Sequence, residues 1–178
     1  MNGGGIRGDK VISPGPLTSR DVYALVPFSN AVVKVELTGA ALLQMFEHGL
    51  AQADNQGGGF RQVSGVQITY DGRKPAGSRV VAVTVGGKPL NPDARYTVAT
   101  IDFIVNGGDG QTAFRGARRL LNPNNAPDLP TLVLRAIEAK KTIAPGVEGR
   151  IRAVSPQSRL PYTLSRARED RMIAGHLA

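Results

Sequence analysis

Two side chains that could hold a small polar ligand lie in one short stretch of the sequence, residues 101–110. Phe103 offers a flat apolar face, and Asp109 can accept hydrogen bonds from paired hydroxyl groups. Three glycines frame the acid: Gly107, Gly108 and Gly110. Glycines allow a loop to bend sharply and a ligand to approach the main chain closely. From this stretch alone, a ligand site and an ordinary strand-to-loop turn are both open interpretations.

A second candidate segment opens the chain and reads Asn2-Gly3-Gly4-Gly5-Ile6-Arg7. A glycine run that closes on an arginine can bring backbone N–H groups and a guanidinium to one anion. The segment lacks the Lys-Ser/Thr ending of a phosphate-binding P-loop. Because the motif begins at the second residue, we expect the strand that supports it to lie upstream of Met1.

A third candidate, Phe28, stands at a break between two predicted elements. Pro27 ends a short helix predicted to begin after the N-cap Thr18, and the polar pair Ser29-Asn30 follows the ring. Side chains at such a break can face a cleft. The alternative is a core position, because a single aromatic residue is usually buried.

The elements that position these residues follow from the hydrophobic periodicity. Alternation predicts strands at 31–37, 60–63 and 65–70, and a hairpin at 80–90 that turns at Gly86-Gly87. A helical apolar stripe covers 40–53, with Phe46 in the core, and a second helix within 126–141 is expected to begin near Asp128 and Pro130. Residues 96–105 read as a buried strand and 146–151 as a closing strand. Strands and helices without regular βαβ alternation predict an α+β fold, a mixed β-sheet packed with helices.

The length, composition and net charge of the chain limit the number of domains and the kinds of site and ligand to be expected. The 178 residues fit one domain, which we place at 1–154, followed by a basic and weakly periodic tail at 155–178 that we expect to be flexible. The chain has no cysteine, and its two histidines are His48 and His176, so no metal site is expected. The net charge of +8 suits anionic ligands, but scattered basic residues argue against nucleic acid. Neither a membrane span nor a signal peptide is visible.

Several motifs together carry a family resemblance. They are Asn2–Arg7, Leu25-Val-Pro-Phe28, Glu36-Leu-Thr-Gly39, Phe60-Arg-Gln-Val-Ser-Gly65, Asp102-Phe103, Asn106-Gly-Gly-Asp-Gly110 and Val147-Glu-Gly-Arg-Ile151. In this order and spacing the chain resembles the C-terminal, substrate-binding domain of 5'-nucleotidases, the family that includes UDP-sugar hydrolase and 2',3'-cyclic-nucleotide 2'-phosphodiesterase.

The resemblance implies a nucleoside or nucleotide ligand and a role for each candidate residue. Phe28 and Phe103 would stack on the two faces of the base, and Asp109 would accept hydrogen bonds from the ribose hydroxyls. Arg7 would contact the phosphate or sugar end, with Asn2 and Asn30 as polar contacts. The sequence departs from the family at Gln111, where many relatives have an aromatic residue.

The resemblance also implies a partner. Members of the family carry an N-terminal metallophosphoesterase domain that binds two divalent metals, and we expect that domain to act with this one in cis or in trans. The chain itself is then expected to bind no cofactor and to be inactive alone. Full-length relatives are periplasmic, cell-surface or secreted. A stand-alone nucleotide-binding or interaction module is the alternative function, and an enzyme in its own right is a third.

Overall fold

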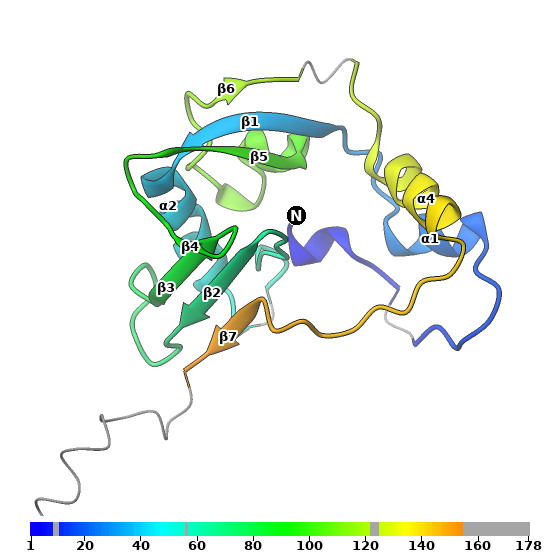
Figure 1. The fold of residues 1–178 in the computed structure, drawn as a ribbon, viewed down its shortest axis with the longest axis horizontal. Coiled ribbons are helices and arrows are strands. Elements are labelled where there is room, and N and C mark those ends of the chain that lie inside the picture. The colour runs from blue at the N-terminus through cyan, green and yellow to red at the C-terminus, as the bar shows by residue number, and fades with distance from the viewer. Residues whose placement is uncertain (9–10, 56, 122–124, 155–178) are drawn as a thin grey trace, which may run out of the picture.

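The computed structural model describes residues 1–8, 11–55, 57–121 and 125–154. They form an α+β fold with two β-sheets (Figure 1). One sheet has three strands in the order β5-β1-β6, and the other has four in the order β4-β3-β2-β7. The predicted α+β class is confirmed, although the strands divide into two sheets where the sequence suggested one. The expected tail at 155–178 lies outside the described residues.

The first sheet is built on β1 (Val32–Thr38) and β5 (Arg95–Ile101). These strands pair in antiparallel register along their whole length, from Val32 opposite Ile101 to Thr38 opposite Arg95. The alternation seen in the sequence faces inward as expected, because Val33, Val35 and Leu37 are buried. The sheet is completed by β6 (Arg118–Arg119), a two-residue strand that no periodicity predicted.

The second sheet contains the predicted hairpin. Its strands β3 (Val80–Val85) and β4 (Lys88–Pro89) turn at Gly86 and Gly87, whose φ angles are 56° and 80°. Two positive φ angles define the primed turn that matches strand twist. Strand β2 (Val66–Tyr70) pairs with β3 on one side and, in parallel, with β7 (Ile151–Ala153) on the other. The closing strand therefore lies at 151–153, and the prediction of 146–151 was wrong in position.

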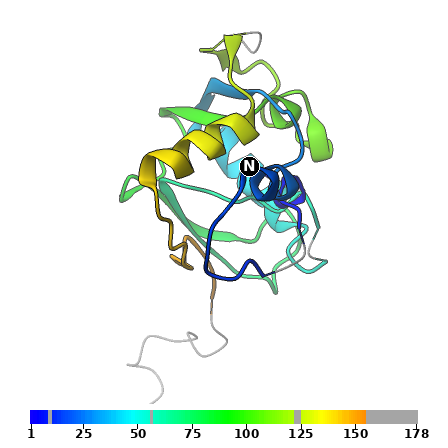
Figure 2. The same ribbon diagram turned by 90° about the vertical axis from the view of Figure 1, so that its right-hand side faces the viewer.

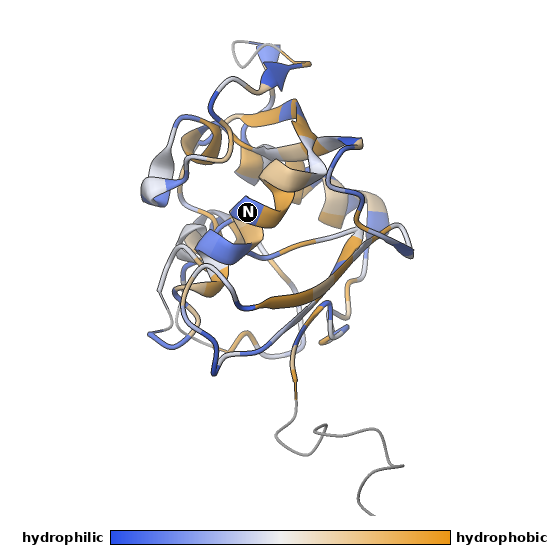
Figure 3. Ribbon diagram, turned by 90° about the vertical axis from the view of Figure 1, so that its left-hand side faces the viewer, coloured by the Kyte–Doolittle hydropathy of each residue, from blue (hydrophilic) through white to orange (hydrophobic). Residues whose placement is uncertain are grey.

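Helix α2 (Gly39–Leu50) supplies much of the core. Thr38 caps its first turn by accepting a hydrogen bond from the N–H of Ala41 at 3.2 Å. The helix buries Leu42, Met45, Phe46 and Leu50. These side chains pack with residues of β1, β2, β3 and β5 in one cluster. In Figure 3 the helix and the strands are mostly orange and many connecting segments are blue, as a core between these elements requires.

Two further helices lie side by side, away from the sheets (Figure 2). Helix α1 (Ser19–Leu25) begins with the predicted cap: Thr18 accepts from the Asp21 N–H, and the Asp21 carboxylate accepts from the Thr18 N–H. Helix α4 (Leu129–Lys140) begins where the sequence predicted, because Asp128 caps its first turn. Among the described residues, no helix combines the length and apolar character needed to cross a bilayer.

The stretch after β5 differs from the sequence-based prediction. The strand ends at Ile101, and residues 102–105 form the one-turn helix α3 (Asp102–Val105), followed by the 3₁₀ turn η2 (Gly108–Gly110). The turn buries Ile104 and leaves Phe103 exposed. An apolar run of this length suits a buried strand or a buried helical turn equally well, and periodicity did not distinguish them.

Candidate functional site

The Asn2–Arg7 segment lies against residues 58–62, far along the chain. The N–H of Gly3 donates to the Phe60 carbonyl at 2.7 Å, and the N–H of Gly4 donates to the Gly58 carbonyl at 2.8 Å. A Cβ on Gly4 would approach the Gly58 Cα to 3.1 Å, so this contact favours glycine. Gly3–Gly5 forms the short 3₁₀ turn η1. The glycines thus serve close backbone packing and place Asn2 and Arg7 at its two ends.

Asp109 is the centre of a polar cluster. Its Oδ2 accepts a hydrogen bond from Asn2 Nδ2 at 2.8 Å and lies 3.6 Å from the Arg61 guanidinium. The Asp109 side chain keeps 23% of its surface exposed, whereas Asn2 and Arg61 are each 5% exposed. The structure therefore brings two predicted residues, Asn2 and Asp109, into contact. A carboxylate has further acceptor positions, which its exposed side can offer to a ligand.

The backbone of Asp109 is held by His48 on helix α2. His48 Nε2 lies 2.8 Å from the Asp109 carbonyl oxygen, and because a carbonyl can only accept, the ring N–H donates. Asp109 has φ of 56°, a conformation that is uncommon for a residue with a side chain. The contact with a core helix fixes this conformation. The His48 ring therefore supports the backbone of the candidate site, a role that the sequence did not indicate.

Arg61 contributes an unusual buried charge. In the described part of the chain, none of its three guanidinium nitrogens makes a hydrogen bond. Burial lowers the pKa of Arg61, and the nearby Asp109 carboxylate partly opposes this effect because it raises the pKa of the guanidinium. Arginine remains protonated under such conditions. The guanidinium therefore places a positive charge beneath Asp109, which offsets the charge of the carboxylate.

Arg7 and Phe28 form a second contact. The Arg7 guanidinium carbon lies 5.3 Å from the centroid of the Phe28 ring, within cation–π range. The N–H of Arg7 donates to the Leu25 carbonyl at 2.7 Å, which ties the segment to the end of α1. The Phe28 ring is 44% exposed, so the core interpretation is wrong. Asn30, two residues later, is half-buried, and its carbonyl accepts from the Leu129 N–H at 2.9 Å.

Phe103 is the other exposed ring, with 42% of its surface accessible. Its edge lies against Gly108, the residue before Asp109 in the chain. The N–H of Asp102 donates to the Ala31 carbonyl at 2.9 Å, and this bond joins the segment after Phe28 to the segment before Phe103. Both rings therefore come from chain segments that meet at one end of β1 and β5.

The contact between Phe103 and Gly108 gives a prediction. A Cβ at position 108 would lie 2.4 Å from Phe103 Cε1, so Gly108→Ala must displace the ring. We expect aromatic proton shifts of Phe103 to change and any ligand that uses this ring to bind several-fold more weakly. Gly146→Ala is the matched control, because no atom lies within 4 Å of the added Cβ. An unchanged Phe103 spectrum in Gly108→Ala would contradict the packing described above.

The described residues do not suit a metal centre. No group of three or more His, Cys, Asp or Glu side chains gathers within ranges 1–8, 11–55, 57–121 and 125–154. Asp109 and His48 meet only through the Asp109 backbone carbonyl. The candidate residues form two contacts, one between Arg7 and Phe28 and one between Asn2 and Asp109.

Two residues that contact Asp109, Arg61 and His48, were not predicted from the sequence as part of the site. Arg61 was expected only as part of a strand at 60–63, yet the described chain there makes only an isolated bridge from Arg61 to Asn2. His48 was recognisable only as a residue on a helical stripe. His48 lies 61 residues before Asp109 in the sequence, and Arg61 lies 48 residues before it (109 − 61). Local periodicity carries no information on such distant contacts. Gln111 is buried, and its Oε1 accepts from the N–H of Ala113 at 2.9 Å.

The sequence model of a known family matches residues 1–116, and its description is "5'-nucleotidase, C-terminal domain". The chain belongs to this family. The match includes all the candidate site residues, from Asn2 to Asp109. The α+β architecture and the family assignment expected from the motifs are thereby confirmed.

Proteins with similar sequences or structures include 5'-nucleotidases and a nucleotide phosphoesterase. The chain is 35% identical over 159 residues to the trifunctional nucleotide phosphoesterase YfkN of Bacillus subtilis, covering 86% of this chain and 11% of that protein. It is 33% identical over 161 residues to human 5'-nucleotidase, covering 85% and 28%. A crystal structure of the 5'-nucleotidase precursor from Thermus thermophilus superimposes with a TM-score of 0.80 at 38% identity, covering 86% and 31%. The chain thus spans less than a third of each of these relatives.

Proposed function

We propose that this member of the 5'-nucleotidase C-terminal domain family binds the nucleoside part of a nucleotide and acts as the substrate-specificity domain of a phosphohydrolase. The observation that carries the proposal is the pair of half-exposed rings, Phe28 and Phe103, together with the partly exposed acid Asp109, whose neighbour Gly108 lies against Phe103. Exposed aromatic rings near an acid suit a ligand that has a flat base and vicinal hydroxyls. The relatives named above include 5'-nucleotidases and a nucleotide phosphoesterase, which supports this ligand class.

Each residue then has a role. Phe28 and Phe103 stack on the base, an interaction that tolerates different bases because every base has a π-face. The Asp109 carboxylate accepts hydrogen bonds from the ribose hydroxyls, and Asn2 orients that carboxylate through their 2.8 Å contact. Arg7 contacts the phosphate or sugar end, where a guanidinium can bond two oxygens at once. Asn30 provides a further polar contact.

Hydrolysis is proposed to need a companion domain. The described residues offer no ligand cluster for a metal, so we assign the two divalent metals to a metallophosphoesterase domain that acts with residues 1–154 in cis or in trans. The residues at 155–178 are proposed to take no part in binding. A stand-alone nucleotide-binding module is the alternative. Phosphate release from AMP on mixing the chain with a catalytic domain of a relative would favour the first function over the second.

A titration of the isotope-labelled 178-residue chain with adenosine tests the proposal. We expect chemical-shift changes confined to the surroundings of Phe28, Phe103 and Asp109, with a dissociation constant of about 1 mM because the phosphate contacts are few. Ribose 5-phosphate lacks a base and should shift Asp109 and Arg7 but not the two rings. The same sample should release no phosphate from AMP with added Mg²⁺, Mn²⁺ or Zn²⁺. Saturating adenosine without shifts at the rings would refute the proposed ligand class.

A further inference from the structure

The side chain of Arg61 lies in a space that the neighbouring helix leaves open. Arg61 is bridged to Asn2 in antiparallel register, and its side chain is buried. Its Cγ lies beside Gly49 of helix α2, where a Cβ would approach it to 2.8 Å. Gly49 is itself buried, so a larger residue there would have to displace the stem of Arg61. The glycine therefore leaves room for the arginine, whose guanidinium lies beside Asp109.

The two carboxylate oxygens of Asp109 have different surroundings. Oδ2 accepts the hydrogen bond from Asn2 and lies 3.6 Å from Arg61 Nη1. Oδ1 makes no hydrogen bond to the residues that the structure describes, and it is not buried. His48 holds the backbone carbonyl of Asp109, so the residue is anchored both through its main chain and through one oxygen of its side chain. The other oxygen, Oδ1, is left for a ligand.

The charge behind Asp109 determines which ligand group its Oδ1 prefers. Among the described residues, Arg61 is the ion-pair partner of this carboxylate. A carboxylate without a partner attracts an ammonium group more strongly than a hydroxyl group, because the attraction of opposite charges adds to the hydrogen bond. With the buried guanidinium in place, an ammonium group at Oδ1 is also repelled by Arg61, and solvent screens this repulsion poorly. A neutral hydroxyl group meets no such repulsion and still finds an acceptor.

We propose that Arg61 is a positioning residue that sets the sugar specificity of the candidate site. Its buried charge makes Asp109 select a neutral vicinal diol and reject a sugar that carries an ammonium group. This selectivity rests on the proposed function, because the diol is that of the bound nucleoside. A role for Arg61 in packing alone would weaken all nucleosides alike and would leave the selection unchanged.

Three nucleosides test the selectivity on the unsubstituted 178-residue chain. They are adenosine, 3'-deoxyadenosine and 3'-amino-3'-deoxyadenosine, all measured by chemical-shift titration at one pH at which the amine is protonated. We expect adenosine to bind most tightly. The amino compound should bind no more tightly than the 3'-deoxy compound, because its ammonium group gains nothing beside the pair of Asp109 and Arg61. Tighter binding of the amino compound than of adenosine would overturn the proposal.

Arg61→Met removes the charge and keeps a long apolar stem beside Gly49. We expect the ratio of the dissociation constants of adenosine and the amino compound to move at least about tenfold in favour of the amino compound, because the uncompensated carboxylate then attracts the ammonium group. Arg61→Lys keeps a positive charge and should restore the preference for adenosine.

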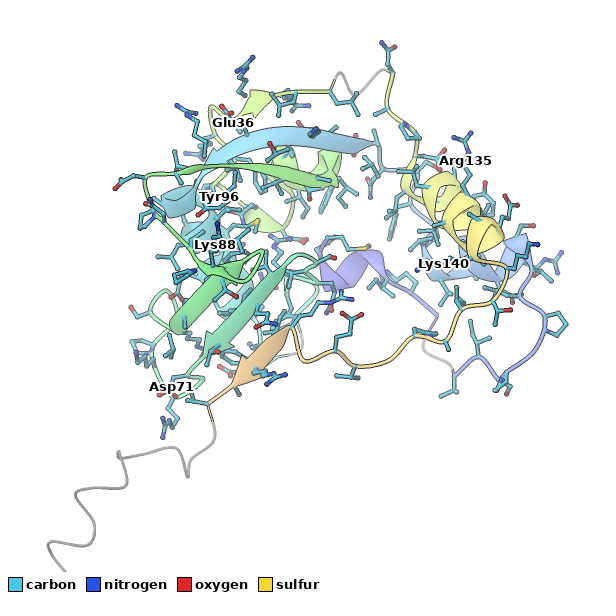
Figure 4. All side chains as sticks on the ribbon, in the orientation of Figure 1. Glu36, Asp71, Lys88, Tyr96, Arg135 and Lys140 are labelled. Carbon is cyan, nitrogen blue, oxygen red and sulfur yellow. The ribbon has the colours of Figure 1, made fainter. Side chains whose placement is uncertain are left out.

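Arg95→Met is the matched control, because it changes the net charge by the same amount at an exposed residue. Arg95 pairs with Glu36, which Figure 4 shows on β1, away from the Asn2–Arg7 segment. This variant should leave the ratio of the two dissociation constants unchanged. A urea melt of each variant reports whether it is folded.

An unchanged ratio in folded Arg61→Met, with adenosine still bound, would overturn the proposal and leave Arg61 a role in packing. If Arg61→Met does not fold, the three nucleosides on the unsubstituted chain decide the question alone. An absence of adenosine shifts at Phe28 and Phe103 in the unsubstituted chain would refute the proposed function and this selectivity with it. Failure of the proposed function is therefore distinguishable from failure of the selectivity, which requires bound adenosine.

Discussion

Phe28→Ala and Phe103→Ala are each expected to weaken adenosine binding by about 1–3 kcal/mol, or roughly 5- to 150-fold, because each removes one stacking surface for the base. Thermal stability should change little, since the two rings are 44% and 42% exposed. Phe28→Ala also loses the contact with Arg7, which at an exposed site contributes about 0.5–1 kcal/mol. Chemical-shift titration and a urea melt of each variant give both quantities.

Tyr23→Ala is the matched control for these two variants. Tyr23 is 48% exposed and lies on α1, five residues before Phe28. Its loss should leave adenosine affinity within error of the unsubstituted chain. If the Phe103→Ala variant binds adenosine as well as the Tyr23→Ala variant does, the ring does not stack on the base, and the proposed site is wrong at this residue.

Phe46→Ala is expected to have the opposite effect, a loss of about 3–5 kcal/mol of unfolding free energy. The ring is 2% exposed and packs in the core cluster beneath both sheets. Domains of this size are stable by only about 5–15 kcal/mol, so the variant is expected to be partly unfolded near 37 °C. Equilibrium urea denaturation followed by circular dichroism measures the change. A loss below about 1 kcal/mol would mean that the core can close over the deleted ring.

The sequence predicted those elements whose pattern is local. Val33, Val35 and Leu37 alternate in β1 and are buried as expected, and Thr18 and Thr38 cap the helices that follow them. Each of these signals depends on neighbours within about four residues. The hairpin at Gly86-Gly87 belongs to the same group, because the turn type follows from the two residues themselves.

The sequence could not predict features that depend on distant contacts. Nothing near Arg61 indicates that it would be buried beside Asp109, and nothing near His48 indicates that it would hold the Asp109 carbonyl. The exposure of Phe28 was also undetermined, since the same local pattern fits a core ring. The motif resemblance favoured a cleft-facing position for Phe28 over a core position, and the structure places the ring at the surface. The roles of the six site residues toward a ligand remain predictions.

The contact between Asn2 and Asp109 joins residues 107 positions apart, and this separation bears on how the protein is made. Strand β1 pairs with β5, which is synthesised some sixty residues after β1. Strand β2 pairs with β7, which is synthesised about eighty residues after β2. A nascent chain therefore exposes β1 and the glycine-rich Asn2–Arg7 segment until most of the domain has left the ribosome. Sheets closed by such distant partners fold in milliseconds to seconds. Asp109 is synthesised after β5, so the contact with Asn2, and with it the candidate site, forms late in biosynthesis.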